Sequence, residues 1–180
     1  STARYYDGYT TAKAGENLRK YSEDFSNSYW TKINTTVTSN QTASPLGTTT
    51  GDKVIIASNT SFHDAYVNQE YAKAGEYYTH SVYVKAGTGI PSVYFYSSFN
   101  GGLIAKFNLT NGTYTGNAPG NGYSSFASVG IQDVGNGWYR IFATYLETSS
   151  TNRPFTLGIS TTTADTVTTL AGNGTDHCFI

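Results

Sequence analysis

The chain has 180 residues, of which 13% are charged and 15% aromatic, and its formal net charge is -1. This length suits one domain with a single core, and the balanced charge argues against nucleic acid and membrane surfaces as partners. The single cysteine, Cys178, excludes an internal disulfide. The many Tyr, Thr, Ser, Asn and Gly residues favour strands and turns over helices.

Residues 1–16 contain few aliphatic side chains and are predicted to form a lead-in arm. Residues 17–180 are predicted to form the folded domain, which begins with a strand, a turn and a buried Trp30. Further strands are expected over 33–39, where side chains alternate, over the apolar run 52–57, and over 65–70.

The strand expected over 77–85 has two faces: Tyr77, Thr79, Ser81, Tyr83 and Lys85 on one, and Tyr78, His80, Val82 and Val84 on the other. The next strand, 92–99, places Tyr94 and Tyr96 opposite Val93 and Phe95, and either pair suits the core. A hairpin then leads into 103–109. Residues 114–125 are polar and rich in glycine, which predicts a long surface loop.

The clearest prediction is a β-hairpin over Val129–Thr144, because two strand-like runs flank Gly135-Asn136-Gly137. On its second arm Trp138, Arg140, Phe142 and Thr144 share one face, and Tyr139, Ile141, Ala143 and Tyr145 share the other. We expect Trp138, Phe142 and Trp30 to be structural core residues.

After a strand at 153–160, the last strand is expected at 177–180, and we expect the end of this strand to be missing from the sequence. About ten short strands separated by Gly, Asn and Pro predict an all-β fold, an antiparallel β-sandwich of jelly-roll type.

No catalytic residue is predicted. The three histidines lie far apart, and Glu23 and Asp24 point to opposite faces of an extended chain, so a solvated turn is the better interpretation of that pair. No cofactor is expected, although Asp and Asn oxygens near Asp176 could bind a structural Ca²⁺. The identity of any metal ligands is not predicted.

The tyrosines suggest carbohydrate binding, because an aromatic ring packs against the apolar face of a sugar. The candidate ligand-binding residues are Tyr94, Tyr96, Tyr83 and His80. The alternative is that these rings only fill the core or an oligomer interface.

Several segments, in order along the chain, resemble a β-sandwich module common in virion proteins of tailed bacteriophages, one that is similar to carbohydrate-binding modules. They are Asn17-Leu18, YSEDFSN at 21–27, Trp30-Thr31-Lys32, PLGTTT at 45–50, SVYVKAG at 81–87, DVGNGWYR at 133–140 and GNGT at 172–175. The resemblance covers the chain from about Tyr5 onwards.

The resemblance implies a non-enzymatic virion structural or adhesion module on a tail fibre, spike or other appendage, with other virion proteins and a host-surface glycan as partners. It also implies a homotrimer in the full assembly. Two alternatives remain: a carbohydrate-binding module attached to a secreted polysaccharide-degrading enzyme, and a glycosidase or lyase that needs converging carboxylates or a Tyr, His and Arg cluster.

Overall fold

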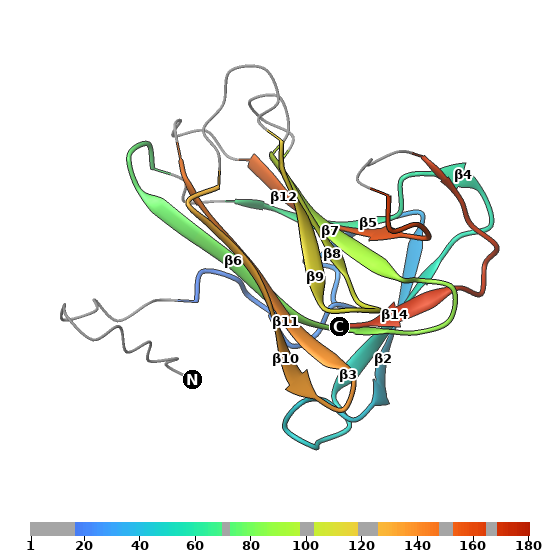
Figure 1. Ribbon diagram of the computed structural model, residues 1–180. Helices are drawn as coiled ribbons and strands as arrows, with labels where there is room; N and C mark the ends of the chain where they lie inside the picture. Colours follow the sequence, from blue (N-terminus) through green and yellow to red (C-terminus); the bar gives the residue numbers. More distant parts are fainter. Residues whose placement is uncertain (1–16, 70–72, 98–102, 119–125, 148–152, 165–168) are drawn as a thin grey trace.

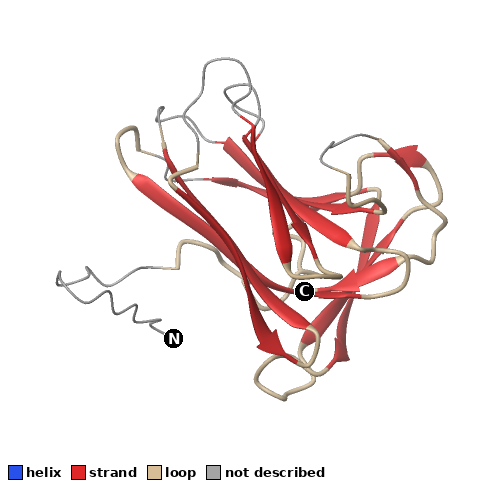
Figure 2. Ribbon diagram, viewed as in Figure 1, coloured by secondary structure: helices blue, strands red, loops and turns tan. Residues whose placement is uncertain are grey.

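The computed structural model describes residues 17–69, 73–97, 103–118, 126–147, 153–164 and 169–180. These residues form strands, turns and loops without a helix (Figure 2), so the described part has no helix that would cross a membrane. Two six-stranded antiparallel sheets pack face to face (Figure 1), which confirms the predicted β-sandwich. The jelly-roll type stays a prediction.

Sheet A has the strand order β1-β5-β12-β7-β8-β9, and sheet B has the order β10-β11-β6-β14-β3-β2. The strands of sheet A are β1 (Thr31–Ile33), β5 (Asp64–Gln69), β12 (Arg153–Ser160), β7 (Ser92–Ser97), β8 (Leu103–Asn108) and β9 (Thr113–Ala118). Those of sheet B are β10 (Ser128–Gly135), β11 (Trp138–Leu146), β6 (Tyr77–Ala86), β14 (His177–Phe179), β3 (Gly51–Ile56) and β2 (Thr35–Thr42). A small third sheet pairs β4 (Thr60–Ser61) with β13 (Leu170–Ala171).

The core lies between the sheets and follows from the period of two along each strand. Sheet A contributes Val93, Phe95, Ala105, Phe107, Leu157 and Ile159, and sheet B contributes Val54, Ile56, Val84, Ile141, Ala143, Tyr145 and Cys178. Val93 and Phe95 are therefore the core pair of β7, which places Tyr94 and Tyr96 on the outer face.

Asn34 carries the chain from one sheet to the other. The strand predicted from Ile33 is split at this residue into β1 of sheet A and β2 of sheet B. Asn34 has a φ of 51°, in the left-handed region that asparagine tolerates. Its side-chain amide donates to Phe62 O at 2.9 Å, and its carbonyl oxygen accepts from Ala57 N at 2.8 Å, so the bend is held by hydrogen bonds.

The predicted hairpin is confirmed, with β10 and β11 joined at Asn136-Gly137. Gly135, Asn136 and Gly137 all have positive φ, and the register shifts between Asp133 and Gly135, as in a bulge beside the turn. Two other expectations were wrong. The described residues before Thr31 form turns rather than a strand, and residues 114–118 of the loop expected over 114–125 belong to the edge strand β9 (Thr113–Ala118). The rest of that expected loop, 119–125, lies outside the described residues.

Candidate ligand-binding face

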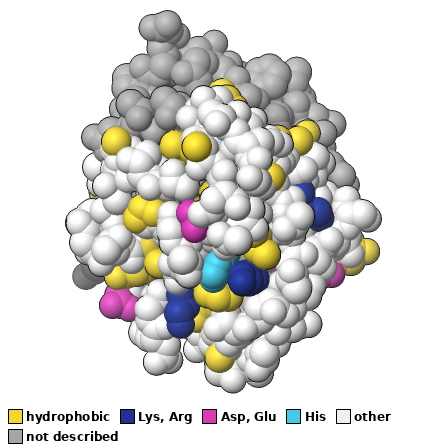
Figure 3. Space-filling view, turned by 90° about the vertical axis from the view of Figure 1, so that its right-hand side faces the viewer, with side chains coloured by type: hydrophobic (Ala, Val, Ile, Leu, Met, Phe, Trp, Pro, Cys, Tyr) yellow, Lys and Arg dark blue, Asp and Glu magenta, His cyan; other side chains and the backbone are white. Residues whose placement is uncertain are grey.

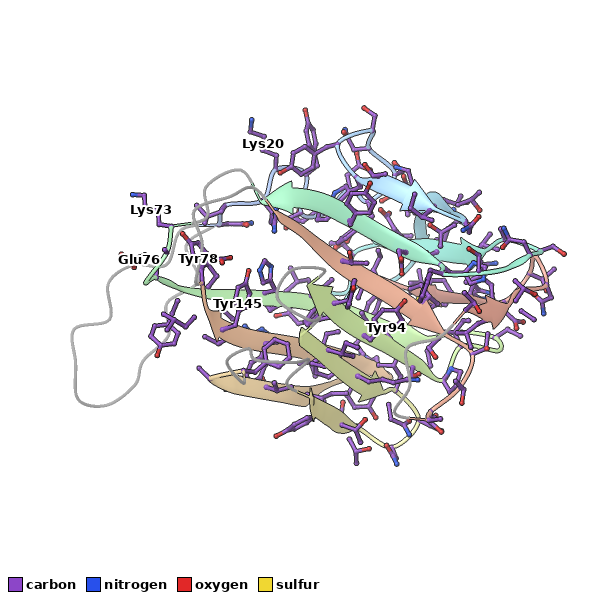
Figure 4. The ribbon with its side chains drawn as sticks, turned by 90° about the horizontal axis from the view of Figure 1, so that it is seen from above. Lys20, Lys73, Glu76, Tyr78, Tyr94 and Tyr145 are labelled. Carbon is purple, nitrogen blue, oxygen red and sulfur yellow. The ribbon has the colours of Figure 1, made fainter. Side chains whose placement is uncertain are left out.

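The four residues proposed to bind ligand lie in three different places. Tyr94 and Tyr96 lie on the outer face of sheet A, Tyr83 lies on the outer face of sheet B, and His80 lies on the inner side of β6. The His80 ring stacks on that of Tyr145, and Figure 4 shows Tyr145, with Tyr78, well apart from Tyr94. The structure therefore does not bring the four candidates into one site.

Tyr94 is buried, with 3% of its surface exposed, although it faces away from the core. Its ring lies over Gly158 on the neighbouring strand β12, where an added Cβ would come within 1.9 Å of Tyr94 Cζ. Because the ring crosses β12 at this glycine, the Tyr94 hydroxyl can donate to Asp64 Oδ1 on β5, at 2.9 Å. Burial raises the pKa of the Asp64 carboxyl and of the Tyr94 hydroxyl. The pair is a partly buried structural contact that links β7 to β5 across β12.

Residues 161–164 cover part of the outer face of sheet A. Ser92 Oγ and Ser160 Oγ donate to Thr162 O at 2.6 and 2.9 Å, and Lys106 Nζ donates to Ala164 O. Ser92, Ser160 and Lys106 are consequently buried on a face that would otherwise be exposed to solvent. Tyr96 is half-buried. This covering makes sheet A the poorer candidate for contact with a large ligand.

His80 is buried near one end of the sandwich. Its Nε2 lies 3.1 Å from the Tyr145 hydroxyl, and the two ring planes differ by only 8°. Tyr78 packs beside Tyr145, with ring centroids 6.4 Å apart. Burial, and next the positive charge of Arg19, hold the pKa of His80 well below its ordinary value. His80 is thus a neutral member of the packed interior rather than a surface ligand-binding group.

Tyr83 is exposed to 45% on the outer face of sheet B and pairs across the strands with Arg140 of β11. The Arg140 guanidinium carbon lies 5.4 Å from the centre of the Phe142 ring, a cation–π contact. Phe142 in turn lies over Gly130, where an added Cβ would come within 2.4 Å of its ring. Tyr83, Arg140 and Phe142 therefore form one aromatic and cationic cluster over neighbouring strands.

A second row of side chains crosses the same face next to this cluster. Lys85 of β6 pairs with Phe179 of β14, which pairs with Lys53 of β3. The His177 ring meets the Phe179 ring edge-on, with centroids 5.3 Å apart. Figure 3 shows a histidine flanked by basic side chains on this side of the molecule, and His177 is the histidine that is not buried.

We call these residues the aromatic–cationic face of sheet B: Lys53, Tyr83, Lys85, Arg140, Phe142, His177 and Phe179. Of the residues singled out in the sequence as ligand-binding, only Tyr83 belongs to it. The other six members of the face were not predicted from the sequence, because strands that are distant in the sequence bring them together. The insertion of β14 between β6 and β3 places Phe179 between two lysines that are 32 positions apart in the sequence, at 53 and 85.

The expected core residues have mixed outcomes. Trp30 and Trp138 are buried, with 9% and 1% of their surface exposed. Phe142 is half-buried on the outer face, so the prediction that it is core was wrong. The core face of β11 is instead the one with Ile141 and Ala143. Trp138 shares the outer face with Phe142 but is covered by the chain at Ala43, whose carbonyl accepts from Trp138 Nε1 at 2.9 Å.

The described residues contain no group of three or more His, Cys, Asp or Glu side chains that could hold a metal ion. Asp24, one of the paired carboxylates, accepts from Ser26 Oγ at 2.6 Å and from the Asn27 amide at 3.2 Å within a turn, which agrees with the turn interpretation. Burial raises the pKa of the Cys178 thiol to about 12, so it is a packing group.

No family model matches this chain, and no curated protein shows significant similarity to it. The fold and the aromatic–cationic face define the class, an all-β sandwich with aromatic and basic side chains on the outer face of one sheet. The likeness to the phage virion module stays a prediction.

Proposed function

We propose that this domain is a non-enzymatic adhesion module of a bacteriophage virion appendage, such as a tail fibre or spike, and that it contacts host-surface carbohydrate through the aromatic–cationic face. The observation that carries the proposal is the exposed Tyr83 beside Arg140 and Phe142 on a sheet face. Aromatic rings stack on the apolar faces of sugars, and the arginine supplies hydrogen-bond donors for sugar oxygens.

Two further observations support a binding role over a catalytic one. Segments from Asn17 to Thr175 resemble a virion module in which no catalytic motif is fixed. The half-buried Asp64 carboxylate accepts from the Tyr94 hydroxyl, and the buried Asp52 carboxylate accepts from the backbone amides of Phe25 and Asn40 at 2.9 and 3.1 Å. Both therefore have structural partners, whereas a glycosidase needs two carboxylates facing one cleft.

The experiment is a binding measurement of the purified chain on immobilised bacterial surface polysaccharides. Tyr83→Ala should weaken binding by about tenfold, the loss of one stacking ring. Tyr114→Ala is the matched control, since Tyr114 is equally exposed at 47% but lies on β9 of sheet A. An equal loss of binding for the two substitutions would contradict the assignment of binding to the outer face of sheet B.

The same face also suits a carbohydrate-binding module of a secreted polysaccharide-degrading enzyme. Immunogold electron microscopy of phage particles from the source separates the two functions. We expect gold label on an appendage, where the module would also contact other virion proteins. Detection only with a secreted enzyme would support the alternative.

A further inference from the structure

We propose that the aromatic–cationic face binds an anionic polysaccharide, one whose sugars carry carboxylate or other acidic groups. This inference rests on the carbohydrate binding proposed above and names the class of ligand.

The charges of sheet B are sorted by face. Its strands contain three basic residues, Lys53, Lys85 and Arg140, and alternation from buried Val54, Val84 and Ile141 places all three outward. The strands contain two acidic residues, and alternation places neither of them with the three basic residues. Asp52 is buried, and Asp133, which pairs with Tyr139, is exposed at the end of the hairpin, where its Oδ1 accepts from Gly135 N at 2.8 Å. The charged strand residues that alternation places on the outer face are thus all cationic, although the whole chain has a net charge of -1.

The two lysines come from the strands that flank Phe179 of β14. Lys85 and Lys53 lie on the strands to either side of Phe179, so their Cα atoms are about 10 Å apart, twice the strand spacing. Two like charges on one sheet face repel each other, and this cost is offset when an anion lies between them. A sugar ring stacked on Phe179 would lie between these two flexible cationic side chains, and the half-exposed His177 borders the same ring.

The face is long enough for more than one sugar. Along β6 the row of Lys85 and Phe179 is two residues from the row of Tyr83 and Arg140, which is about 7 Å. Each row pairs an aromatic ring with a cation. This repeated pairing fits a polymer with recurring acidic sugars.

Nucleic acid is the competing polyanion. The chain carries 11 basic and 12 acidic residues, and only three basic residues lie on this face, fewer than the six to ten phosphate contacts that support tight duplex binding. Anionic polysaccharide, with more widely spaced charges and sugar rings that stack on aromatic side chains, suits the face better.

The test uses an array of bacterial surface polysaccharides, each presented in its native form and with its carboxyl groups reduced to alcohols. The full chain should bind acidic polymers and lose about tenfold or more in affinity for the reduced forms. Binding should weaken as NaCl rises from about 50 to about 300 mM, because exposed charges are screened.

The double variant Lys53→Gln/Lys85→Gln should lose about tenfold or more in affinity for the acidic polymer and most of the salt dependence. The double variant Lys20→Gln/Lys73→Gln is the matched control. Both of these lysines are exposed, lie outside sheet B (Figure 4), and give the same change of net charge. Unchanged thermal unfolding confirms that either variant is folded.

The outcomes separate this inference from the proposed function. Binding of native and reduced polymers with equal affinity would overturn the anionic ligand and leave carbohydrate binding in place. Binding to no polymer would overturn both. Equal losses in the two double variants, or tighter binding to duplex DNA than to any acidic polysaccharide, would overturn the assignment of this face to an anionic polysaccharide.

Discussion

Trp138 shows how a residue is buried without belonging to the main core. It lies on the outer face of β11, where its ring packs against Gly51 and its Nε1 donates to Ala43 O at 2.9 Å. Trp138→Ala should lower the free energy of unfolding by about 3–5 kcal/mol, because a large cavity and an unpaired carbonyl remain. Urea denaturation measures this. Phe142→Ala, on the same face but half-buried, should cost clearly less. An equal cost for both would contradict the different burial of the two rings.

His80 predicts a dependence of stability on pH. Its pKa is lowered in the folded state by burial, whereas an unfolded histidine titrates near pH 6.5. Below about pH 6.5 the unfolded chain therefore binds a proton that the folded chain does not, and stability falls by up to about 1.4 kcal/mol per pH unit until the folded pKa is reached. The charge of Arg19 adds to this effect.

Comparing wild type with His80→Gln between pH 7 and pH 5 checks that dependence. The free energy of unfolding of the variant should decline less steeply with falling pH, since glutamine does not titrate. Parallel pH profiles would show that His80 is not the group responsible.

At the scale of elements, sheet A depends on close contact between β12 and β7. Gly158 leaves room for the Tyr94 ring, which reaches across β12 to Asp64. Gly158→Ala should displace that ring and cost about 1–3 kcal/mol of stability from overpacking. Tyr94→Phe, which keeps the ring and removes only the hydrogen bond, should cost less, about 1 kcal/mol. Chemical denaturation measures both losses of stability. A larger loss for Tyr94→Phe than for Gly158→Ala would contradict this account of the contact.

At the scale of the whole molecule, the question is assembly. The resemblance implies a trimer in the virion, but the sequence contains no coiled-coil heptads or fibrous repeat to drive it. We expect the sandwich, residues 17–180, to be monomeric, and assembly to depend on residues 1–16 or on other chains. Light scattering at micromolar concentration checks this. A stable trimer of residues 17–180 would show that the sandwich carries its own interface.

Most local features of this protein can be predicted from its sequence alone. Alternation identified most strands, including both faces of β6 and β11, and the glycines around Asn136 located the hairpin. These features depend on neighbours in sequence, through φ preferences and the period of two. Thr113–Ala118 escaped detection because an edge strand needs only backbone pairing on one side, which a polar segment satisfies.

Which strand face is inside, and which residues meet across a sheet, depend on how the whole sandwich packs. Phe142 and Ile141 are equally suited to a core by composition, and the choice between them depends on what packs against each face. In the same way, Phe179 lies between Lys53 and Lys85 only because β14 inserts between β6 and β3. Strand order brings together residues that are distant in the sequence, so the aromatic–cationic face has no local signal and arises only when the sheet is assembled.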